Sequence, residues 1–295
     1  MPRNPGLEDA IPSGLAEKRP RLVRNDKPGG EGEGEGGLPH NHDEKMRPLD
    51  QIRRERDCFA RAPSLASLPN MIRLVLFDID GTLIQSGGAG EKSFARVCAT
   101  EFGVPNGTAR LHFAGRTDPS IIREFFEQHQ IPATPENFQR FFDRYVFCLD
   151  FMLGQLAGRV LPGVERMITG MKTMPEPPLL GLLTGNIRLG AEIKLSHYGL
   201  WDHFRTGGFA DDHEDRNQIA MVARERGSKF LRRKLSGDEI LVIGDTPRDV
   251  ECGRVIGAKV LAVATGMYSV EKLHAEKADW TVETLDQVSA AELCL

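Results

Sequence analysis

Residues 74–83 read LVLFDIDGTL, an apolar run that breaks into two aspartates one residue apart. Such a run is typical of a strand that is buried on both faces of a parallel sheet, and ligands bind at the carboxyl ends of strands in such sheets. Residues i and i+2 of an extended chain point to the same side, so Asp78 and Asp80 can face one small volume. Two carboxylates this close repel each other unless a cation lies between them or one keeps its proton. The stretch therefore indicates a metal, a nucleophile and an acid/base group in one place; a solvated Asp-rich turn is the alternative.

Short apolar strands alternate with helical stretches from Arg73 onward. This alternation is typical of a parallel sheet with helices on both faces. We therefore predict an α/β fold with a doubly wound parallel sheet. The predicted strands are 74–77, 179–183, 240–243 and 260–263, with weaker ones near 207–210 and 279–282, and the predicted helices between them include 188–197, 219–227 and 249–257.

Two more of these strands end in small polar residues. The strand ending in LLTGN supplies the hydroxyl of Thr184 and the backbone amide of Asn186, which can line an anion at the start of the next helix. The strand that runs into GDTPRD places Asp245 at its end and Asp249 in the first turn of the next helix. Each residue also has an ordinary role in a turn or a helix cap. Three strand ends that each carry such a cluster indicate a site more strongly than one does.

Residues 86–161 break the alternation of strands and helices. They contain no convincing strand, and their apolar residues recur at helical spacing. We predict a small helical domain inserted after the first strand, with 71–85 and 162–295 forming the α/β core. The aromatic side chains are expected to form the core of this inserted domain rather than a ligand site. Its three helix faces contain Phe94, Val97, Cys98 and Phe102; Ile121, Ile122, Phe125 and Phe126; and Phe138, Phe141, Phe142, Tyr145 and 147–156.

The composition excludes several classes of partner. The chain has 38 Lys and Arg against 42 Asp and Glu, and a net charge of -4 gives no reason to expect nucleic acid or an anionic membrane. No apolar run approaches the roughly 20 residues of a membrane helix. The five cysteines form no CxxC pair, which favours reduced thiols and a cytoplasmic location. The sequence predicts no protein partner.

Residues 1–70 differ from the rest of the chain. They carry 9 of the 18 prolines, the tract GGEGEGEGG, and 12 basic against 12 acidic residues. Without a sustained apolar period they cannot bury enough surface to offset the entropy of ordering. We therefore predict a disordered N-terminal extension. Because the folded domain would begin almost at Met71, the extension is either an upstream extension of the reading frame or a genuine regulatory or tethering tail.

The three motifs resemble those of haloacid dehalogenase (HAD) superfamily hydrolases, with a layout close to that of phosphoglycolate-phosphatase-like members. DIDGT resembles the DxDGT nucleophile motif of the family, LLTGN its second motif and GDTPRD its acidic fourth motif. The resemblance runs from Met71 to about Val288. The 106 positions from Asp78 to Thr184 leave room for a helical cap, whereas the 61 from Thr184 to Asp245 are too few for a larger α/β cap. The resemblance implies a HAD-like Rossmann-type core with a helical cap.

The resemblance also implies the chemistry. Asp78 would attack the phosphorus of a phosphomonoester and form an aspartyl-phosphate intermediate. Asp80 would protonate the leaving alkoxide and then take a proton from the hydrolytic water. Mg²⁺ would be held by Asp78, the backbone carbonyl of Asp80 and Asp245, while Asp249 would keep the waters or neighbours of the metal in place.

Thr184 and the amide of Asn186 would bind the phosphoryl group together with a cation. The family usually has a lysine before the helix that precedes the fourth motif, but the segment GFADDHEDRNQI has none. We assign this role to Arg216, because a guanidinium group can bind phosphate. The alternatives are that Arg216 pairs with aspartates of its own loop, or that Lys194 replaces it. Lys194 is expected to pack on the surface of its helix.

Substrate choice is expected to depend on cap residues that reach over Asp78. The candidate is Arg116 in the segment GRTD, which could bind a carboxylate or second anion of the substrate; a salt bridge within the cap is an equal alternative. The resemblance disfavours phosphonatases, which need a cap lysine that residues 93–171 lack. It also disfavours dehalogenases, which lack the aspartate that Asp80 supplies.

We therefore expect a cytoplasmic, Mg²⁺-dependent phosphatase that hydrolyses a small phosphorylated metabolite, with 2-phosphoglycolate as the leading substrate. A sugar-phosphate mutase shares this chemistry and differs in its cap contacts. A non-catalytic binding or regulatory module is the third alternative, and the presence of all the motif aspartates argues against it.

Overall fold

The computed structural model describes residues 71–295. The predictions for residues 1–70 lie outside this part of the chain, and so does Cys58. The other four cysteines are free and buried. Among the described residues, none of the helices combines the length and the apolar character that crossing a membrane requires.

Six parallel strands form one sheet in the order β5-β4-β1-β6-β7-β8. β1 lies inside the sheet, paired with β4 on one side and β6 on the other. The predicted doubly wound α/β fold is therefore confirmed, including both weaker strands. The strands are β1 (Leu74–Phe77), β4 (Leu179–Leu183), β5 (Thr206–Gly208), β6 (Ile240–Gly244), β7 (Lys259–Val263) and β8 (Trp280–Val282).

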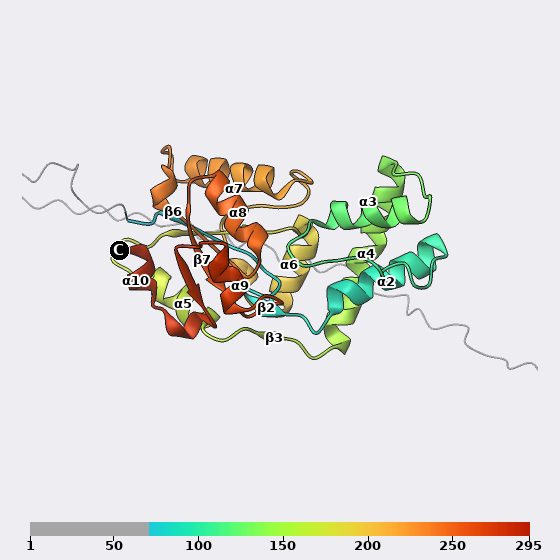
Figure 1. Ribbon diagram of the computed structural model, residues 1–295, viewed down its shortest axis with the longest axis horizontal. Coiled ribbons are helices and arrows are strands. Elements are labelled where there is room, and N and C mark those ends of the chain that lie inside the picture. Colours follow the sequence, from blue (N-terminus) through green and yellow to red (C-terminus); the bar gives the residue numbers. More distant parts are fainter. Residues whose placement is uncertain (1–70) are drawn as a thin grey trace, which may run out of the picture. The chain divides into compact units, whose positions relative to one another are not determined.

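Helices cover both faces of the sheet. Successive strand residues point to opposite sides, so an apolar strand presents apolar side chains on both faces. Phe77 belongs to the apolar cluster on one face and Leu76 to the cluster on the other, and both are fully buried. In Figure 1, α7 lies above the strands and α5 below them. The first cluster includes residues of α5 (Val164–Lys172), α6 (Arg188–His197) and α10 (Ala290–Cys294), and the second includes residues of α7 (Arg216–Phe230), α8 (Pro247–Val255) and α9 (Val270–Ala275).

Two helices begin earlier than the apolar periodicity predicted. The side chain of Asp215 caps α7 by accepting a hydrogen bond from the amide of Asn217, and the helix begins at Arg216. Thr246 and Asp249 form a capping box at the start of α8, whose first residue is Pro247. Caps precede the first apolar position of a helix, so periodicity alone places the start too late. These caps place Arg216 and Asp249 at helix ends that face the carboxyl edge of the sheet.

The inserted region contains three helices, α2 (Ala89–Phe102), α3 (Asp118–Gln128) and α4 (Pro135–Gln155). They share one apolar cluster, in which the ring of Phe94 lies 4.8 Å from that of Tyr145 and 5.0 Å from that of Phe141. The predicted aromatic core is present. The prediction was wrong for two residues at the end of the third stretch, since Phe147 and Phe151 lie on the outer face of α4 and are 71% and 56% exposed.

A short antiparallel pair connects the helical region to the sheet. β2 (Ile84–Gln85) pairs with β3 (Arg159–Val160), so the chain enters and leaves the helices side by side. Gly87 has a φ of 64°, and a Cβ atom there would lie 2.5 Å from the carbonyl oxygen of Ala157. Only glycine fits this position. Helices α2 to α4 lie beyond this pair in Figure 1. The boundaries 71–85, 86–161 and 162–295 remain a prediction.

Candidate active site

A tight turn follows β1 and positions the first two aspartates. The amide of Asp78 donates to the carbonyl of Ile243 on the neighbouring β6 at 2.9 Å. The chain then turns at Gly81, whose φ of 84° favours glycine. A Cβ atom on Gly81 would lie 2.3 Å from Oδ2 of Asp245, so the turn also depends on glycine for space. Asp78 is buried, whereas 43% of the Asp80 side chain is exposed.

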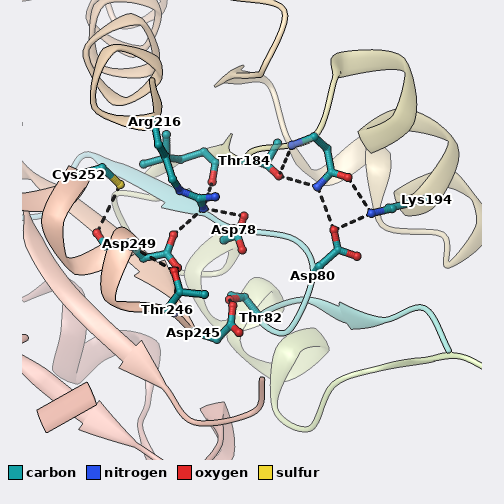
Figure 2. A network of polar contacts seen from close by, with 12 residues as sticks. Asp78, Asp80, Thr82, Thr184, Lys194, Arg216, Asp245, Thr246, Asp249 and Cys252 are labelled. Atoms are coloured by element: carbon teal, nitrogen blue, oxygen red, sulfur yellow. Dashed lines mark hydrogen bonds and ion pairs between the residues drawn. The ribbon is translucent and has the colours of Figure 1, made fainter. Parts of the chain in front are cut away.

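Three carboxylates from two strand ends meet beyond this turn. Oxygens of Asp78, Asp245 and Asp249 all lie within 4.8 Å of one another, and all three residues are buried. The hydroxyl of Thr82 donates to Oδ1 of Asp245 at 3.1 Å. Figure 2 shows these side chains converging below the end of β1. The structure thus brings together residues that are up to 171 positions apart in the sequence.

Arg216 is the cation of this cluster. Its Nη2 lies 2.9 Å from Oδ1 of Asp78 and 2.6 Å from Oδ1 of Asp249. The alternative that Arg216 pairs with aspartates of its own loop is wrong, whereas its role in binding phosphate stays a prediction. Asp215 instead caps α7, and Asp212 pairs with another arginine, Arg226.

Asp249 orients Arg216 and caps α8 at the same time. Its Oδ2 accepts hydrogen bonds from the amide of Thr246 at 3.0 Å and from the hydroxyl of Thr246 at 2.7 Å, while Oδ1 accepts from Arg216. A Cβ atom on Gly244 would lie 2.2 Å from Cγ of Asp249, so the strand approaches this carboxylate very closely. Asp249 therefore caps α8 and also holds Arg216, while its predicted role beside a metal stays a prediction.

The cluster carries more negative charge than Arg216 compensates. Burial raises the pKa of Asp78, Arg216 opposes this, and Asp249 and Asp80 add to the rise. Burial, followed by Asp78 and Asp249, raises the pKa of Asp245 well above its usual range. Hard oxygen donors with unbalanced negative charge are the ligands that a divalent cation such as Mg²⁺ prefers. The residues present therefore fit the predicted metal.

A second polar group lies on the other side of Asp78. Nζ of Lys194 lies 2.6 Å from Oδ2 of Asp80 and 2.7 Å from Oδ1 of Asn186, and Nδ2 of Asn186 donates to the same oxygen of Asp80 at 2.9 Å. Figure 2 shows Asp80 turned toward Lys194 and Asp78 turned toward Arg216. The expectation that Lys194 packs on the helix surface was wrong. It is 4% exposed.

The spacing of α6 contained a signal for Lys194. The buried residues of this helix are Gly190, Ala191, Lys194 and Leu195, which lie one turn apart on one face. A lysine in the middle of a buried helix face needs a charged partner. This pattern could have identified Lys194 as a residue that points into the site.

Thr184 and Asn186 lie at the end of β4, as the second motif predicted, and both are buried. The hydroxyl oxygen of Thr184 accepts hydrogen bonds from the side-chain amide of Asn186 at 2.8 Å and from its backbone amide at 3.2 Å. The backbone amide that was expected to bind the phosphoryl group thus donates to Thr184 here. Both residues line the same cavity as Asp78.

The start of α3 docks against the second motif. The amide of Asp118 donates to the carbonyl of Gly185 at 2.7 Å, and its Oδ2 accepts from the amide of Ile187 at 2.8 Å. A Cβ atom on Gly185 would lie 2.0 Å from the carbonyl oxygen of Arg116. Burial raises the pKa of Asp118 to about 7, although Lys194 opposes this. Arg116 was the residue predicted to act in the segment GRTD, whereas Asp118, which forms this contact, was not predicted.

Arg116 forms the salt bridge within the cap that was the alternative interpretation. Its Nη1 pairs with Glu124, and its Nη2 donates to the carbonyl of Ser120 at 2.8 Å. Both partners belong to α3. The guanidinium group therefore turns onto the helix that follows it in the chain.

One cavity of about 320 Å³ connects all these groups. Its volume is at the lower end of the range for small-molecule sites. It is lined by the motif residues Asp78, Asp80, Thr184, Asn186, Arg216 and Asp245, together with Lys194 and cap residues that include Arg116, Asp118 and Tyr145.

Residues 75–263 match the family model described as haloacid dehalogenase-like hydrolase. This match spans β1 to β7 and includes all three motifs. The chain belongs to the haloacid dehalogenase-like hydrolases. The family prediction and the prediction of a hydrolase are therefore confirmed.

Curated HAD relatives are about one quarter identical in sequence. A bifunctional riboflavin kinase/FMN phosphatase of Arabidopsis thaliana is 25% identical over 200 residues, which are 67% of this chain and 50% of the relative. The chain thus spans about half the length of that relative. A phosphoglycolate phosphatase of Synechococcus elongatus is 25% identical over 224 residues, 72% of this chain and 93% of the relative.

A solved structure, CbbY from Rhodobacter sphaeroides in complex with phosphate, has a similar fold. It has a TM-score of 0.60 and 15% identity, and the alignment covers 76% of this chain and all of that chain. At this identity the likeness concerns the HAD fold alone.

Proposed function

We propose that the protein is a Mg²⁺-dependent phosphatase that hydrolyses a small phosphomonoester through an aspartyl-phosphate intermediate. The observation that carries the proposal is the arrangement around Asp78. This buried carboxylate contacts a cation, Arg216, and lies within 4.8 Å of two further carboxylates, while Asp80 lies beside it on the same turn. Phosphoryl transfer depends mainly on positioning and charge neutralisation, and these groups supply both.

Asp78 is the proposed nucleophile. Its Oδ1 is held by Arg216, so the other oxygen is the one available to attack phosphorus in line with the leaving group. The bond that forms joins this oxygen to phosphorus, and the bond that breaks joins phosphorus to the alkoxide of the substrate. Water then attacks the aspartyl-phosphate, releases inorganic phosphate and regenerates the carboxylate.

Asp80 is the proposed general acid and base. It would donate a proton to the leaving alkoxide and later take one from the attacking water. Lys194 and Asn186 both hold Oδ2 of Asp80, so the other oxygen is the one that can transfer the proton. Lys194 is thus a positioning residue for Asp80.

The proposed metal ligands are Asp78, Asp245 and the backbone carbonyl of Asp80. A bound Mg²⁺ supplies positive charge that offsets the charge of the phosphoryl oxygens. Asp249 is already engaged by Arg216 and Thr246, so it supports the site rather than supplying a free ligand.

The phosphoryl group would be bound by Arg216 and Thr184. Nε of Arg216 has no hydrogen-bond partner among the described residues, so the guanidinium group keeps a buried donor. The hydroxyl of Thr184 can donate to a phosphoryl oxygen while its own oxygen accepts from Asn186. The relatives named above as FMN phosphatase and phosphoglycolate phosphatase support a small phosphorylated substrate. The cytoplasmic location stays a prediction.

The test is phosphate release from a panel of phosphorylated metabolites, with and without Mg²⁺, by the wild type and by Asp78→Asn. We expect metal-dependent release that falls at least about 10³-fold in the variant, because the nucleophile is lost. Conversion of a sugar phosphate into its isomer without net phosphate release would indicate the mutase instead. Binding of phosphate esters without any turnover would indicate the non-catalytic module.

A further inference from the structure

The cavity beyond Asp78 contains three basic side chains, and each is already paired. Among residues 71–295, the basic side chains lining the cavity are those of Arg116, Lys194 and Arg216. Their carboxylate partners are Glu124 for Arg116, Asp80 for Lys194, and Asp78 with Asp249 for Arg216.

The acidic side chains in the lining outnumber these cations. They belong to Asp78, Asp80, Glu91, Asp118 and Asp245. A Mg²⁺ ion on the motif aspartates would offset the charge of one phosphoryl group. A second anion on the substrate would have to displace Glu124 or Asp80 from a cation, or lie unpaired beside the carboxylates. Both options are costly in a site with little water.

One wall on the cap side of the cavity consists mainly of apolar side chains. Phe94, Phe113, Ile121 and Tyr145 contribute to this wall, and Phe94, Ile121 and Tyr145 are at most 2% exposed. Apolar surface of this kind is favourable for the carbon skeleton of an alcohol, and among these four side chains a hydrogen-bond donor is offered by the hydroxyl of Tyr145 alone.

We propose that the substrate is a phosphomonoester whose leaving alcohol carries no negative charge. This inference rests on the proposed phosphatase function and narrows its substrate class. It disfavours 2-phosphoglycolate, whose leaving alcohol carries a carboxylate group. It favours phosphate esters of neutral polyols, sugars or apolar alcohols. The pairing of Arg116 with Glu124 keeps the guanidinium group that could have accepted a carboxylate bound to the cap.

Two matched pairs of esters test the proposal with the wild-type protein and Mg²⁺. 2-Hydroxyethyl phosphate is compared with 2-phosphoglycolate, and glycerol 3-phosphate with 3-phosphoglycerate. Each pair differs by a CH₂OH group in place of a carboxylate. We expect kcat/KM to be at least about tenfold higher for the neutral member of each pair, because the cavity offers the second charge no unpaired cation; a tenfold ratio corresponds to about 1.4 kcal/mol. An equal or higher kcat/KM for the carboxylates would overturn the inference while leaving the phosphatase proposal intact, whereas no release from any of the four would count against both.

Glu124→Gln tests the reason for the selectivity. Removing the charge of Glu124 frees Arg116, and we expect kcat/KM for the carboxylate member to rise about fivefold or more, with the neutral member changed less than twofold. Glu127→Gln is the matched control, because Glu127 is an exposed residue of the same helix and forms no salt bridge with Arg116 among the described residues. If Glu124→Gln leaves the ratio of the two substrates unchanged, the pairing of Arg116 does not exclude the carboxylate and the inference fails.

Discussion

The balance of positive and negative charge differs between the two ends of the cavity. At the phosphoryl end, Asp78, Asp245 and Asp249 share one cation, Arg216. At the cap end, Arg116 pairs with Glu124 and stays partly exposed. One end therefore leaves negative charge unbalanced, while the arginine of the other end is paired within the cap.

Because of this difference, the phosphoryl end is suited to the charged group of a substrate and the cap end to its carbon skeleton. Unbalanced carboxylates are costly unless a further cation arrives, so the phosphoryl end is arranged for a metal and the anion that accompanies it. The arginine at the cap end already has a carboxylate partner, so it does not need a charged group of the substrate. The cap end can therefore select a substrate mainly by shape and by apolar contact.

Removal of metal should have the largest effect, and it should act on the phosphoryl end alone. With EDTA we expect phosphate release to fall by at least about 10³-fold and to return with excess Mg²⁺, since the metal offsets charge in the transition state. A second readout is thermal unfolding, in which Mg²⁺ should raise the Tm of the wild type but not that of Asp245→Asn. Full activity in EDTA would contradict the metal assignment.

Arginine substitutions should separate the two ends in stability. Arg216→Ala leaves Asp78 and Asp249 buried without their cation, and we expect the free energy of unfolding to fall by about 3–5 kcal/mol. Arg116→Ala is the matched control at the cap end, where the partly exposed pair should contribute about 0–1 kcal/mol. Urea unfolding of both variants measures the difference. Similar losses of unfolding free energy in the two variants would show that the two ends of the cavity do not differ in how their charges are balanced.

Asp118 should make stability depend on pH, because it is a buried acid at the contact between α3 and the second motif. Its pKa is raised from 3.8 to about 7, first by burial and then by Asp80 and Asp211, against Lys194 and the amide of Ile187. The folded protein therefore keeps a proton that the unfolded chain loses. The stabilisation is present below about pH 4 and is lost as pH rises toward 7, by up to about 4 kcal/mol.

Unfolding free energies of the wild type and Asp118→Asn between pH 4.5 and 7.5 test this sign. The other acids are common to both proteins and cancel in the difference. The wild type should lose stability relative to the variant as pH rises. A difference that stays constant over this range would mean that Asp118 is ionised throughout.

Lys194→Met should reduce the free energy of unfolding by a smaller amount, and it should also lower kcat. The variant leaves Asp80 and Asn186 without a charged donor, and hydrogen bonds to charged groups contribute about 1.5–3 kcal/mol. We expect a loss of this size in unfolding free energy, and a kcat reduced about tenfold with KM changed less. Lys229→Met is the control, because within residues 71–295 Lys229 pairs with Glu225 alone, on the exposed face of α7. A change in KM alone would show that Lys194 does not act through Asp80.

Much of the fold could be predicted because its signals are local. The buried strands read as apolar runs, and β4 and α6 have the predicted bounds. Helix starts were less accurate, since the caps at Asp215 and Thr246 lie outside the apolar period. Phe147 and Phe151 were misplaced because aromatic residues on the outer face of α4 cannot be distinguished by type from those on its inner face.

The residues of the candidate site also divide into those with a local signal in the sequence and those without one. Asp78, Asp80, Thr184 and Asp245 follow strands, and the carboxyl ends of parallel strands meet at one edge, so their sequence position sufficed to group them. Lys194 was only an alternative to Arg216, and Asp118 was not predicted as a site residue, because each reaches the site from a helix whose docking cannot be derived from its own sequence.

The order of strands and helices, the motif residues and the predicted helical insertion follow from strand runs, helical periods and strand-end aspartates, which depend on neighbours along the chain. The pairing of each cation with its carboxylate depends on the folded chain. Arg216 binds Asp78 and Asp249, Lys194 binds Asp80, and Arg116 turns back to Glu124. The physical reason is that charge pairing inside a protein depends on distances of a few ångströms between elements that lie far apart in the chain.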